Sequence, residues 1–415
     1  MSEASQIEIT IIGAGIVGVN TALRLQAAGH RVQIIDMNEP AQGCSSGNAG
    51  VIAVYGVTPV SMPGLWKQVP KMLMDPMGPL TIRRQHALKL VPWLMRFMKA
   101  GNPKVVEHSA RALAGLVTNS YQDYRQITAK YDLDEYIKSS PILAVYESRA
   151  HFERDRYAWD LRRRNGIQWD ELSTADLHAL EPSLSAAFDF AVAMPGSGFV
   201  RDPQGFTQAL FMQFIRNGGQ FKKTKVLGIR PNGGTTVLNT STGEITTQKT
   251  VIAAGAFSAQ LTEQLGDKIP LQQERGYHLT LSEYAGTSPR HAIMSPKHKV
   301  IVTPMDVGIR IAGMVEFGGF LPPNYARSDV LYGQLQELFP TVEGGQRSNW
   351  MGHRPTLPDS LPVIDRSTVS PHVYYAFGHQ HVGLTSAPKT AQLITEMIEG
   401  QTPALDIKPF SAKRF

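Results

Sequence analysis

A glycine-rich turn near the start of the chain has the spacing of a phosphate-binding loop. Gly13, Gly15 and Gly18 stand in the hexapeptide GAGIVG. The first glycine permits a tight turn, the second lets a phosphate approach the backbone, and the third lets a helix pack closely on a strand. A helix that starts inside such a turn directs free N–H groups and the positive end of its dipole at a diphosphate. The turn therefore predicts dinucleotide binding.

The elements on either side of this turn must hold it in place. Residues 7–12 are a short apolar run, typical of a strand that is buried on both faces. Residues 16–28 have a helical pattern that ends at Gly29, and residues 31–35 predict a second strand. Asp36 then follows the turn by about 20 residues, where a carboxylate can bind a ribose diol. The residues expected around the dinucleotide are Gly13, Ala14, Gly15, Ile16, Val17, Gly18 and Asp36.

A polar loop follows the second strand. Residues 44–50 read CSSGNAG and offer hydroxyls, an amide and exposed backbone to a phosphate or a flavin ring. The same composition is equally typical of a polar surface loop. The glycine turn by itself leaves NAD and FAD open, and the candidate ligands in this loop are Ser45, Ser46 and Asn48.

Composition limits the classes of protein that the chain can belong to. Of its 415 residues 42% are hydrophobic, and 41 basic against 35 acidic residues leave a net charge of +6. This balance favours anionic small molecules or surfaces, and the absence of a compact Lys/Arg block argues against nucleic acid as a partner. The length suits two domains rather than one.

The cellular environment is inferred from what the sequence lacks. Cys44 is the one cysteine, so neither an intramolecular disulfide nor a thiolate metal site can form, and we expect no bound metal. No signal peptide is recognisable, and no run reaches the roughly 18 apolar residues that span a bilayer. We expect a cytoplasmic protein, either free or peripheral on the inner face of a membrane.

One segment could provide such a membrane contact. Residues 66–98 mix Trp, Met and Leu with Lys and Arg, which fits interfacial binding if the apolar side chains are exposed. The alternative is a lid or packing segment of a substrate domain.

The rest of the chain alternates helical and strand patterns. We expect strands at residues 221–229, 235–240, 244–254, 271–281, 299–314 and 373–377, and helices at residues 203–217 and 387–399.

Five separated motifs occur in the order seen in FAD-dependent D-amino acid dehydrogenases, within the D-amino acid oxidase and glycine/sarcosine oxidase group. Beside the N-terminal unit and SSGNAG they are VIAAGAFS (251–258), GHRPTLPDSLPVID (352–365) and FGHQHVGLTSAP (377–388). The chain resembles this group over nearly its whole length. The resemblance implies non-covalent FAD, an α/β fold with an FAD-binding Rossmann-like domain and a discontinuous β-rich substrate domain.

The resemblance also implies roles for individual residues. Arg354, in GHRP, matches the arginine that clamps the substrate carboxylate, and Tyr277 matches a tyrosine near the substrate. His353 stands where the family carries an apolar residue, and its side chain could have a packing role only. His278 and His381 are further candidates for the substrate pocket. The further FAD contacts that the resemblance implies are Val226, Gly255, His379, Gly383, Leu384 and Thr385.

The implied activity is oxidative deamination of D-amino acids, cyclic imino acids such as D-proline included. A hydride passes from the substrate Cα to flavin N5, which leaves an imine and then a 2-oxo acid. The resemblance favours a dehydrogenase that passes electrons to a quinone or another carrier. A glycine/sarcosine-type oxidase and a non-enzymatic FAD-binding redox sensor remain as alternatives.

Motifs at both ends of the chain predict domains that are discontinuous in sequence. We expect residues 1–100, 195–265 and 340–415 to form the FAD-binding domain, and residues 101–194 and 266–339 to form the substrate-binding domain.

Overall fold

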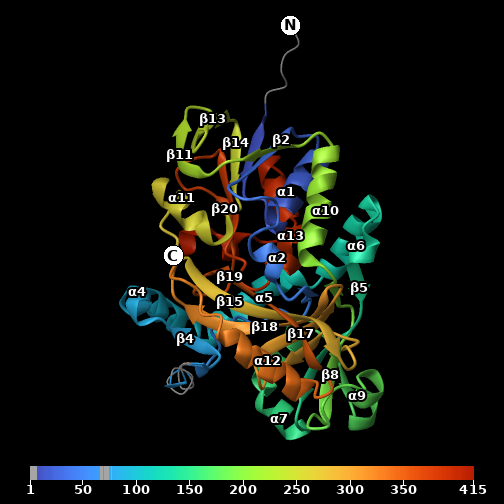
Figure 1. Cartoon of the computed structure of the whole chain (residues 1–415). Coiled ribbons are helices and arrows are strands. Elements are labelled where there is room, and N and C mark those ends of the chain that lie inside the picture. The colour runs from blue at the N-terminus through green and yellow to red at the C-terminus, as the bar shows by residue number, and fades with distance from the viewer. Residues whose placement is uncertain (1–6, 66–68, 70–73, 76) are drawn as a thin grey trace.

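The computed structural model describes residues 7–65, 69, 74–75 and 77–415. Two large sheets organise this part of the chain (Figure 1). A six-stranded sheet with helices α1, α10 and α13 lies toward the N-terminus in the view, and a nine-stranded sheet lies below it. The architecture confirms the expected fold class.

The six-stranded sheet contains the predicted β-α-β unit. Its strand order is β10-β2-β1-β14-β21-β20, and every neighbouring pair is parallel except β20 with β21. The first strand thus lies inside the sheet, as a dinucleotide-binding sheet requires. Its strands are β10 (Gln220–Lys223), β2 (Val32–Asp36), β1 (Ile9–Ile12), β14 (Lys249–Ile252), β21 (Val373–Phe377) and β20 (Val363–Arg366).

Apolar residues cover both faces of this sheet, which explains why its strands lack polar alternation. Ile9 and Ile11 pack into the core beneath α1 (Ile16–Ala27), α10 (Pro203–Arg216) and α13 (Gly383–Ile398). Ile12 and its neighbours pack on the opposite face, against the small sheet of β11 (Val226–Asn232), β12 (Thr235–Thr240) and β13 (Gly243–Thr247).

Helix α13 begins four residues earlier than the pattern indicated and contains Pro388 within its second turn. A proline has no N–H to donate to the carbonyl four residues before it, which here is Leu384. The hydroxyl of Tyr124, from α6 (Ser120–Tyr131), donates to that carbonyl at 2.6 Å. The helix therefore continues through the proline because a side chain from a distant helix replaces the missing donor.

The nine-stranded sheet carries the longest strands. β15 pairs antiparallel with β19 on one side and with β18 on the other. The strands are β19 (Glu343–Thr356), β15 (Gln272–Ala285), β18 (Gly308–Phe317), β17 (Val300–Met305), β16 (Ile293–Ser295), β6 (Ile142–Tyr146), β8 (Phe190–Met194), β7 (Asp170–Leu172) and β4 (Leu80–Ile82), which pairs with β18.

Shorter elements connect and cover the two sheets. A small antiparallel sheet consists of β3 (Val51–Ile52), β9 (Gly198–Val200) and β5 (Ile137–Ser139). The helices not yet named are α2 (Cys44–Gly47), α4 (Arg84–Ala100), α5 (Pro103–Val117), α7 (Arg149–Arg154), α8 (Arg156–Arg164), α9 (Thr174–Leu180), α11 (Ser258–Gln264) and α12 (Arg327–Leu338), with short 3-10 turns η2 (Asp134–Tyr136), η3 (Gly255–Phe257), η4 (Lys408–Phe410) and η5 (Ala412–Arg414).

Three of the expected strands were wrong in extent. The run 221–229 divides into β10 and β11, because the chain leaves the parallel sheet at Thr224, whose N–H donates to Asp36 O at 2.8 Å, and enters a different sheet. The run 244–254 likewise divides into β13 and β14, and the run 299–314 is a hairpin of β17 and β18. In each case no glycine or proline signal marks the change clearly enough, and side-chain pattern does not register a change of partner strand.

The predicted division into domains stays a prediction. Strand pairing is relevant to two of its boundaries, those near residues 101 and 340. β4 and α4 precede residue 101, yet β4 pairs with β18. β19 follows residue 340, yet it pairs with β15. Both segments thus lie in the same sheet as β15 and β18.

The segment proposed for membrane contact lies partly outside the described residues, Trp66 included. Within α4, Trp93 is buried and packs against Phe317 with ring centroids 5.3 Å apart, so this side chain is a packing residue, as the alternative had it. The exposed apolar side chains of this helix are Leu88, Val91, Met95 and Met98. Within the described part of the chain, no helix has both the length and the apolarity to cross a bilayer.

One added methyl group tests how closely α1 packs against the turn that precedes it. A Cβ at Gly18 would lie 2.0 Å from Gly13 O, a backbone atom that cannot move aside. We expect Gly18→Ala to lower the free energy of unfolding by about 2–4 kcal/mol. Urea unfolding followed by tryptophan fluorescence measures this change.

Gly333→Ala in α12 is the matched control, because its added Cβ would meet nothing within 4 Å. We expect this control to be neutral or to stabilise by up to about 1 kcal/mol. Equal losses in the two variants would contradict the packing argument.

Candidate active site

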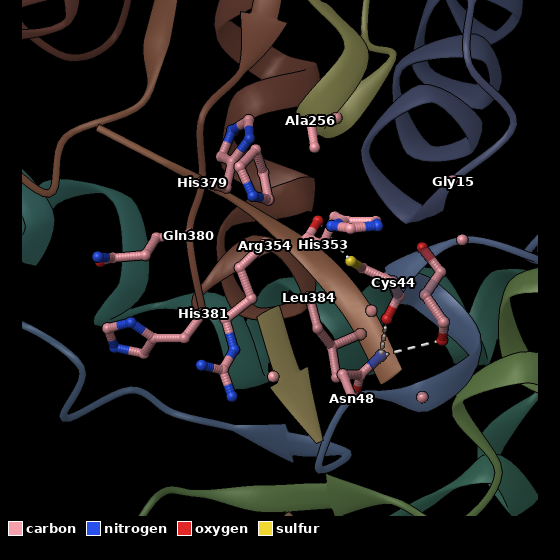
Figure 2. Close-up of a pocket in the computed structure, with 18 of the residues that line it drawn as sticks. Gly15, Cys44, Asn48, Ala256, His353, Arg354, His379, Gln380, His381 and Leu384 are labelled. Carbon is pink, nitrogen blue, oxygen red and sulfur yellow. Dashed lines mark hydrogen bonds between the residues drawn. The ribbon is translucent and has the colours of Figure 1, made fainter. Parts of the chain in front are cut away.

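One cavity of about 1040 Å³ lies between the two large sheets, and side chains from both line it. Its walls are the turn before α1, the end of β2, the Cys44–Gly50 loop, the start of β11, η3, the middle of β15, the end of β18, β19 and the loop before α13. Figure 2 shows part of this lining, with His379 and His353 above Cys44 and with Arg354 and His381 to its left.

The turn before α1 has the geometry that a diphosphate needs. Gly13 has a φ of +119°, and a Cβ there would lie 2.3 Å from Ala253 O, so glycine is required. Gly15 is the N-cap of α1 and provides no side-chain cap, and the first turn holds no acidic residue. Ile16 N donates to Ser45 Oγ at 2.9 Å. The next N–H groups have no acceptor within the helix, so this end of α1 can receive an anion.

Asp36 stands at the edge of the same part of the cavity. Its carboxylate accepts hydrogen bonds from Ala14 N at 2.8 Å and from Asn38 N at 2.9 Å. Burial raises the pKa of Asp36, against the opposing effect of these backbone donors. Val226 and Gly255 also line the cavity, and a Cβ on Gly255 would meet nothing within 4 Å. Gly18 lies behind this surface and does not line it.

The Cys44–Gly50 loop is held by its own asparagine and by an arginine from β18. Asn48 Nδ2 donates to Ser45 O at 2.9 Å, and Asn48 Oδ1 accepts from Gly50 N at 2.8 Å. Arg310 Nη1 donates to the carbonyls of Ser46 and Asn48. Ser45 and Asn48 line the cavity, whereas Ser46 turns its hydroxyl to Gly43 O and does not line it.

The register of β15 with β19 brings three residue pairs to one face of the ribbon that they form. Glu274 lies opposite Arg354, Gly276 opposite Gly352, and His278 opposite Trp350. Residues two apart share a face of a strand. A Cβ at Gly276 would come within 2.3 Å of Arg354 Nη2, so the glycine makes room for the guanidinium.

Arg354 is an ion-pair partner within the protein as well as a cavity residue. Its Nη1 lies 2.6 Å from Glu274 Oε1 and donates to Met314 O at 3.0 Å. Thr356 Oγ1 donates to the other carboxylate oxygen of Glu274. The ion pair fixes the orientation of the guanidinium, and some N–H groups of Arg354 still face the cavity (Figure 2). A guanidinium held in this way can bind a carboxylate.

Tyr277 points to the other face of β15. Its hydroxyl donates to Glu316 Oε2 at 2.5 Å and accepts from Asn324 N at 3.2 Å. The residue belongs to the cavity lining but its side chain is fully buried, with the hydroxyl committed to these two partners.

His278 does not line the cavity. Its ring stacks on Trp350 with centroids 5.1 Å apart, and its Nδ1 lies 2.8 Å from Gly47 O. Burial, helped by the charge of Arg310, lowers the pKa of His278 to about 3. The neutral imidazole therefore donates to the Gly47 carbonyl and holds the Cys44–Gly50 loop against β15.

The loop before α13 brings two further histidines to the cavity. His379 is buried, its Nε2 lies 3.0 Å from Thr390 Oγ1, and burial lowers its pKa to about 3. His381 also lines the cavity, its ring extends away from Arg354 in Figure 2, and desolvation together with the charge of Arg354 lowers its pKa. Both rings are thus neutral at pH 7.

Helix α13 directs its N-terminus at the cavity. Its N-cap residue Val382 makes no side-chain cap, and Gly383 and Leu384 line the cavity. Thr385 does not line the cavity, because its hydroxyl accepts from Ala53 N at 3.0 Å. The free N–H groups and the dipole of this helix favour negative charge at the same place.

These observations fit FAD. The uncapped α1 N-terminus suits the diphosphate, the cavity has room for a large cofactor, and the second helix N-terminus suits an electron-rich ring. Cys44 Sγ lies 2.8 Å from His353 O, and burial raises the pKa of the thiol to about 11, so it stays protonated. A protonated, hydrogen-bonded thiol supports the expectation of non-covalent binding.

Among the cavity residues that sequence reasoning missed are Glu274, Tyr55 and Arg162. Glu274 stands three residues before Tyr277, but only the pairing of β15 with β19 puts it opposite Arg354. Tyr55 and Arg162 lie in segments without a motif, and no local signal could have found them.

Comparison with known proteins places this geometry in a family. Residues 8–397 match the family model described as FAD dependent oxidoreductase. A protein from Bradyrhizobium diazoefficiens named D-amino-acid oxidase is 37% identical over 416 residues, which are 98% of each chain. A D-amino acid dehydrogenase from Cereibacter sphaeroides is 28% identical, over 98% of this chain and 95% of the relative.

Solved structures share the fold. Glycine oxidase from Geobacillus kaustophilus superposes with a TM-score of 0.77 at 20% identity and covers 99% of both chains. L-proline dehydrogenase from P. horikoshii superposes with a TM-score of 0.74 at 18% identity, over 99% of this chain and 98% of that one.

Because His379 is buried and neutral in the folded chain, we expect the stability of the fold to depend on pH. The unfolded chain protonates His379 near pH 6.5, whereas the folded chain does so only near 3, so stability is lost as the pH falls through this window. Between pH 6.5 and pH 5 the free energy of unfolding should fall by about 2 kcal/mol less in His379→Gln than in the parent protein. Urea unfolding at both pH values measures it.

His108→Gln, at an exposed position, is the control and should leave this pH-dependent loss of stability unchanged. An undiminished pH dependence in His379→Gln would show that other groups cause it.

Proposed function

The chain belongs to the family of FAD-dependent oxidoreductases, and we propose that it oxidises the Cα–N bond of D-amino acids, cyclic imino acids such as D-proline included. One observation carries the proposal: a single cavity joins the dinucleotide turn before α1 to the Arg354 guanidinium and the neutral His381. The relative named D-amino-acid oxidase, at 37% identity, supports the substrate class.

When bound, FAD supplies the acceptor for the hydride that leaves the substrate Cα. Arg354 binds the substrate carboxylate and so fixes the direction of the Cα–H bond. Glu274 holds the guanidinium at 2.6 Å, which limits the positions that the carboxylate can take. Arg354 is therefore the residue on which orientation of the substrate depends.

A neutral His381 adds no second positive charge beside Arg354, so it does not repel the substrate ammonium. The ammonium must lose a proton before the hydride leaves Cα, and His381, with its lowered pKa, is too weak a base to hold that proton, which passes to solvent. Loss of that proton and of the hydride leaves an imine. Water then hydrolyses the imine to a 2-oxo acid, or a cyclic imine is released.

We also propose a dehydrogenase that passes electrons to a quinone or another carrier at a membrane surface. Leu88, Val91, Met95 and Met98 lie three or four residues apart on α4, so they share one exposed face. Arg84, Lys89, Arg96 and Lys99 flank them, and the helix contains no acidic residue. An apolar face with a basic rim fits an anionic lipid surface, and α4 lies at the side of the molecule (Figure 1).

The activity is tested by anaerobic reduction of the purified holoenzyme with D- and L-amino acids, D-proline, glycine and sarcosine. We expect the flavin absorbance to bleach with D-amino or D-imino acids. Bleaching by glycine or sarcosine alone would favour the amine oxidase alternative, and no bleaching with any amine would favour a redox sensor. The same reaction in air, with peroxide measured, separates an oxidase from a dehydrogenase.

The role of Arg354 is tested with two variants. We expect Arg354→Ala to lower kcat/KM about 30- to 1000-fold, because the substrate carboxylate loses its partner. Arg354→Lys keeps a charge beside Glu274 but loses the planar fork, and we expect a loss of about tenfold. Flavin absorbance of each variant controls for folding, and unchanged kinetics in both would remove Arg354 from the substrate site.

The membrane contact is tested with vesicles that contain phosphatidylglycerol. We expect Leu88→Ser/Met95→Ser to weaken co-sedimentation about 10- to 100-fold, because two apolar side chains no longer enter the interface. Val369→Ser, an equally exposed apolar residue elsewhere, should bind as the parent does. Equal binding by all three proteins would contradict the assignment of α4.

A further inference from the structure

One side of the cavity lining, called the second lobe below, contains none of the residues expected to hold FAD or the substrate carboxylate. The segment after β3 and helix α8 supply part of its wall. The lining side chains that matter here are Tyr55, Thr58, Tyr146, Trp159, Arg162 and Lys299.

This lobe adjoins the loop that carries His381. A Cβ on Gly56 would lie 3.2 Å from Val382 Cγ1, and Ala53 N donates to Thr385 Oγ1 at 3.0 Å. The backbone on both sides of Tyr55 is thus packed against the start of α13, next to the loop that carries His381.

Arg162 is held in this lobe by an aromatic platform. Its guanidinium carbon lies 4.6 Å from the centre of the Trp159 ring. Trp159 Nε1 in turn donates to the Tyr146 hydroxyl at 2.8 Å, and that hydroxyl donates to Asp155 at 3.2 Å. Stacking fixes the plane of the guanidinium without using its N–H donors.

Most of those donors have no partner. The hydrogen bond recorded for this guanidinium is a long one, from Nη2 to Thr58 Oγ1 at 3.4 Å, and Nε is buried without an acceptor. Within the described residues no carboxylate lies in ion-pair contact with Arg162. The charge is poorly solvated, and burial lowers the pKa of Arg162. This situation differs from that of Arg354, which Glu274 neutralises.

Tyr55 provides a second, independent unpartnered group at the same place. The residue is 4% exposed, and its hydroxyl has no hydrogen-bond partner within the described chain. A buried hydroxyl without a partner is costly, so such a group usually meets a ligand or water. It interacts electrostatically with Arg162, so the two groups are neighbours.

The charges around the lobe leave a positive excess. Lys299 and Asp155 both line the cavity and interact with each other, and Arg162 adds a further cation. Two cations and one carboxylate give a net charge of about +1 for the lobe at pH 7. An anionic group would balance it.

We propose that Arg162 and Tyr55 bind a second carboxylate, carried on the substrate side chain, so that the preferred substrates are acidic D-amino acids. The inference rests on the proposed function, in which Arg354 takes the carboxylate at Cα. Two adjacent N–H groups of Arg162 match the two oxygens of a carboxylate, and the Tyr55 hydroxyl donates a further hydrogen bond. A neutral side chain of similar size would leave the same donors unsatisfied.

The test compares substrates that differ only in this charge. In anaerobic reduction of the holoenzyme, we expect D-glutamate to exceed D-glutamine in kcat/KM by about 10- to 100-fold. Arg162→Gln should lower kcat/KM for D-glutamate by about the same factor and alter that for D-alanine less than about threefold. Tyr55→Phe should lower the D-glutamate value about 3- to 10-fold.

Arg163→Gln is the matched control, because Arg163 is the next residue on α8 and its exposed guanidinium lies over Trp169. It should behave as the parent. Flavin content of each variant reports folding.

Binding of glutarate, which has two carboxylates and no amine, provides a measurement that does not need turnover. We expect perturbation of the flavin spectrum by glutarate to require about tenfold more ligand in Arg162→Gln than in Arg163→Gln. Equal use of D-glutamate and D-glutamine by the parent would overturn the inference, as would an equal loss for D-alanine in Arg162→Gln. Failure of every D-amino acid to bleach the flavin would instead overturn the proposed function.

Discussion

The antiparallel register between β15 and β19 is the constraint on which the substrate side of the site depends. It places Glu274 beside Arg354 and His278 beside Trp350, with the glycine pair Gly276 and Gly352 between them. A slip of one residue would turn one member of each pair to the opposite face. Because the strands are long, many ladder hydrogen bonds resist that slip, and one guanidinium is held in place by the whole ribbon.

The cofactor side depends on a different kind of constraint, the convergence of two helix N-termini. α1 and α13 pack against each other, and each begins at the cavity without a side-chain cap. Uncapped N–H groups are normally a cost, and here they face the space where an anionic cofactor fits. The neutral histidines of the loop before α13 leave that electrostatic pattern unchanged at pH 7.

Arginines in this chain act in distinct ways according to their partners. Arg310 holds backbone carbonyls of the Cys44–Gly50 loop, and Arg354 is balanced by Glu274. Arg162 is stacked on Trp159 and makes no close ion pair within the described chain, although Asp155 acts on it electrostatically. All three are buried to some degree, and their partners decide what each can do: Arg310 fixes the loop, Arg354 offers only the donors that Glu274 leaves free, and Arg162 offers most of its own.

The sequence by itself determined the elements whose signal is local. The run before Gly13, the helix after it and strand β21 follow from glycine geometry and apolar pattern, and the ordered motifs identified the family and FAD. It did not determine the split of residues 221–229 between two sheets, nor the start of α13, where Tyr124 replaces the donor that Pro388 lacks. Only the tertiary structure brought Glu274 to Arg354 and Tyr55 to Arg162. The physical reason is that backbone conformation depends on neighbours in the chain, whereas ion pairs and cavities depend on which distant segments are packed together.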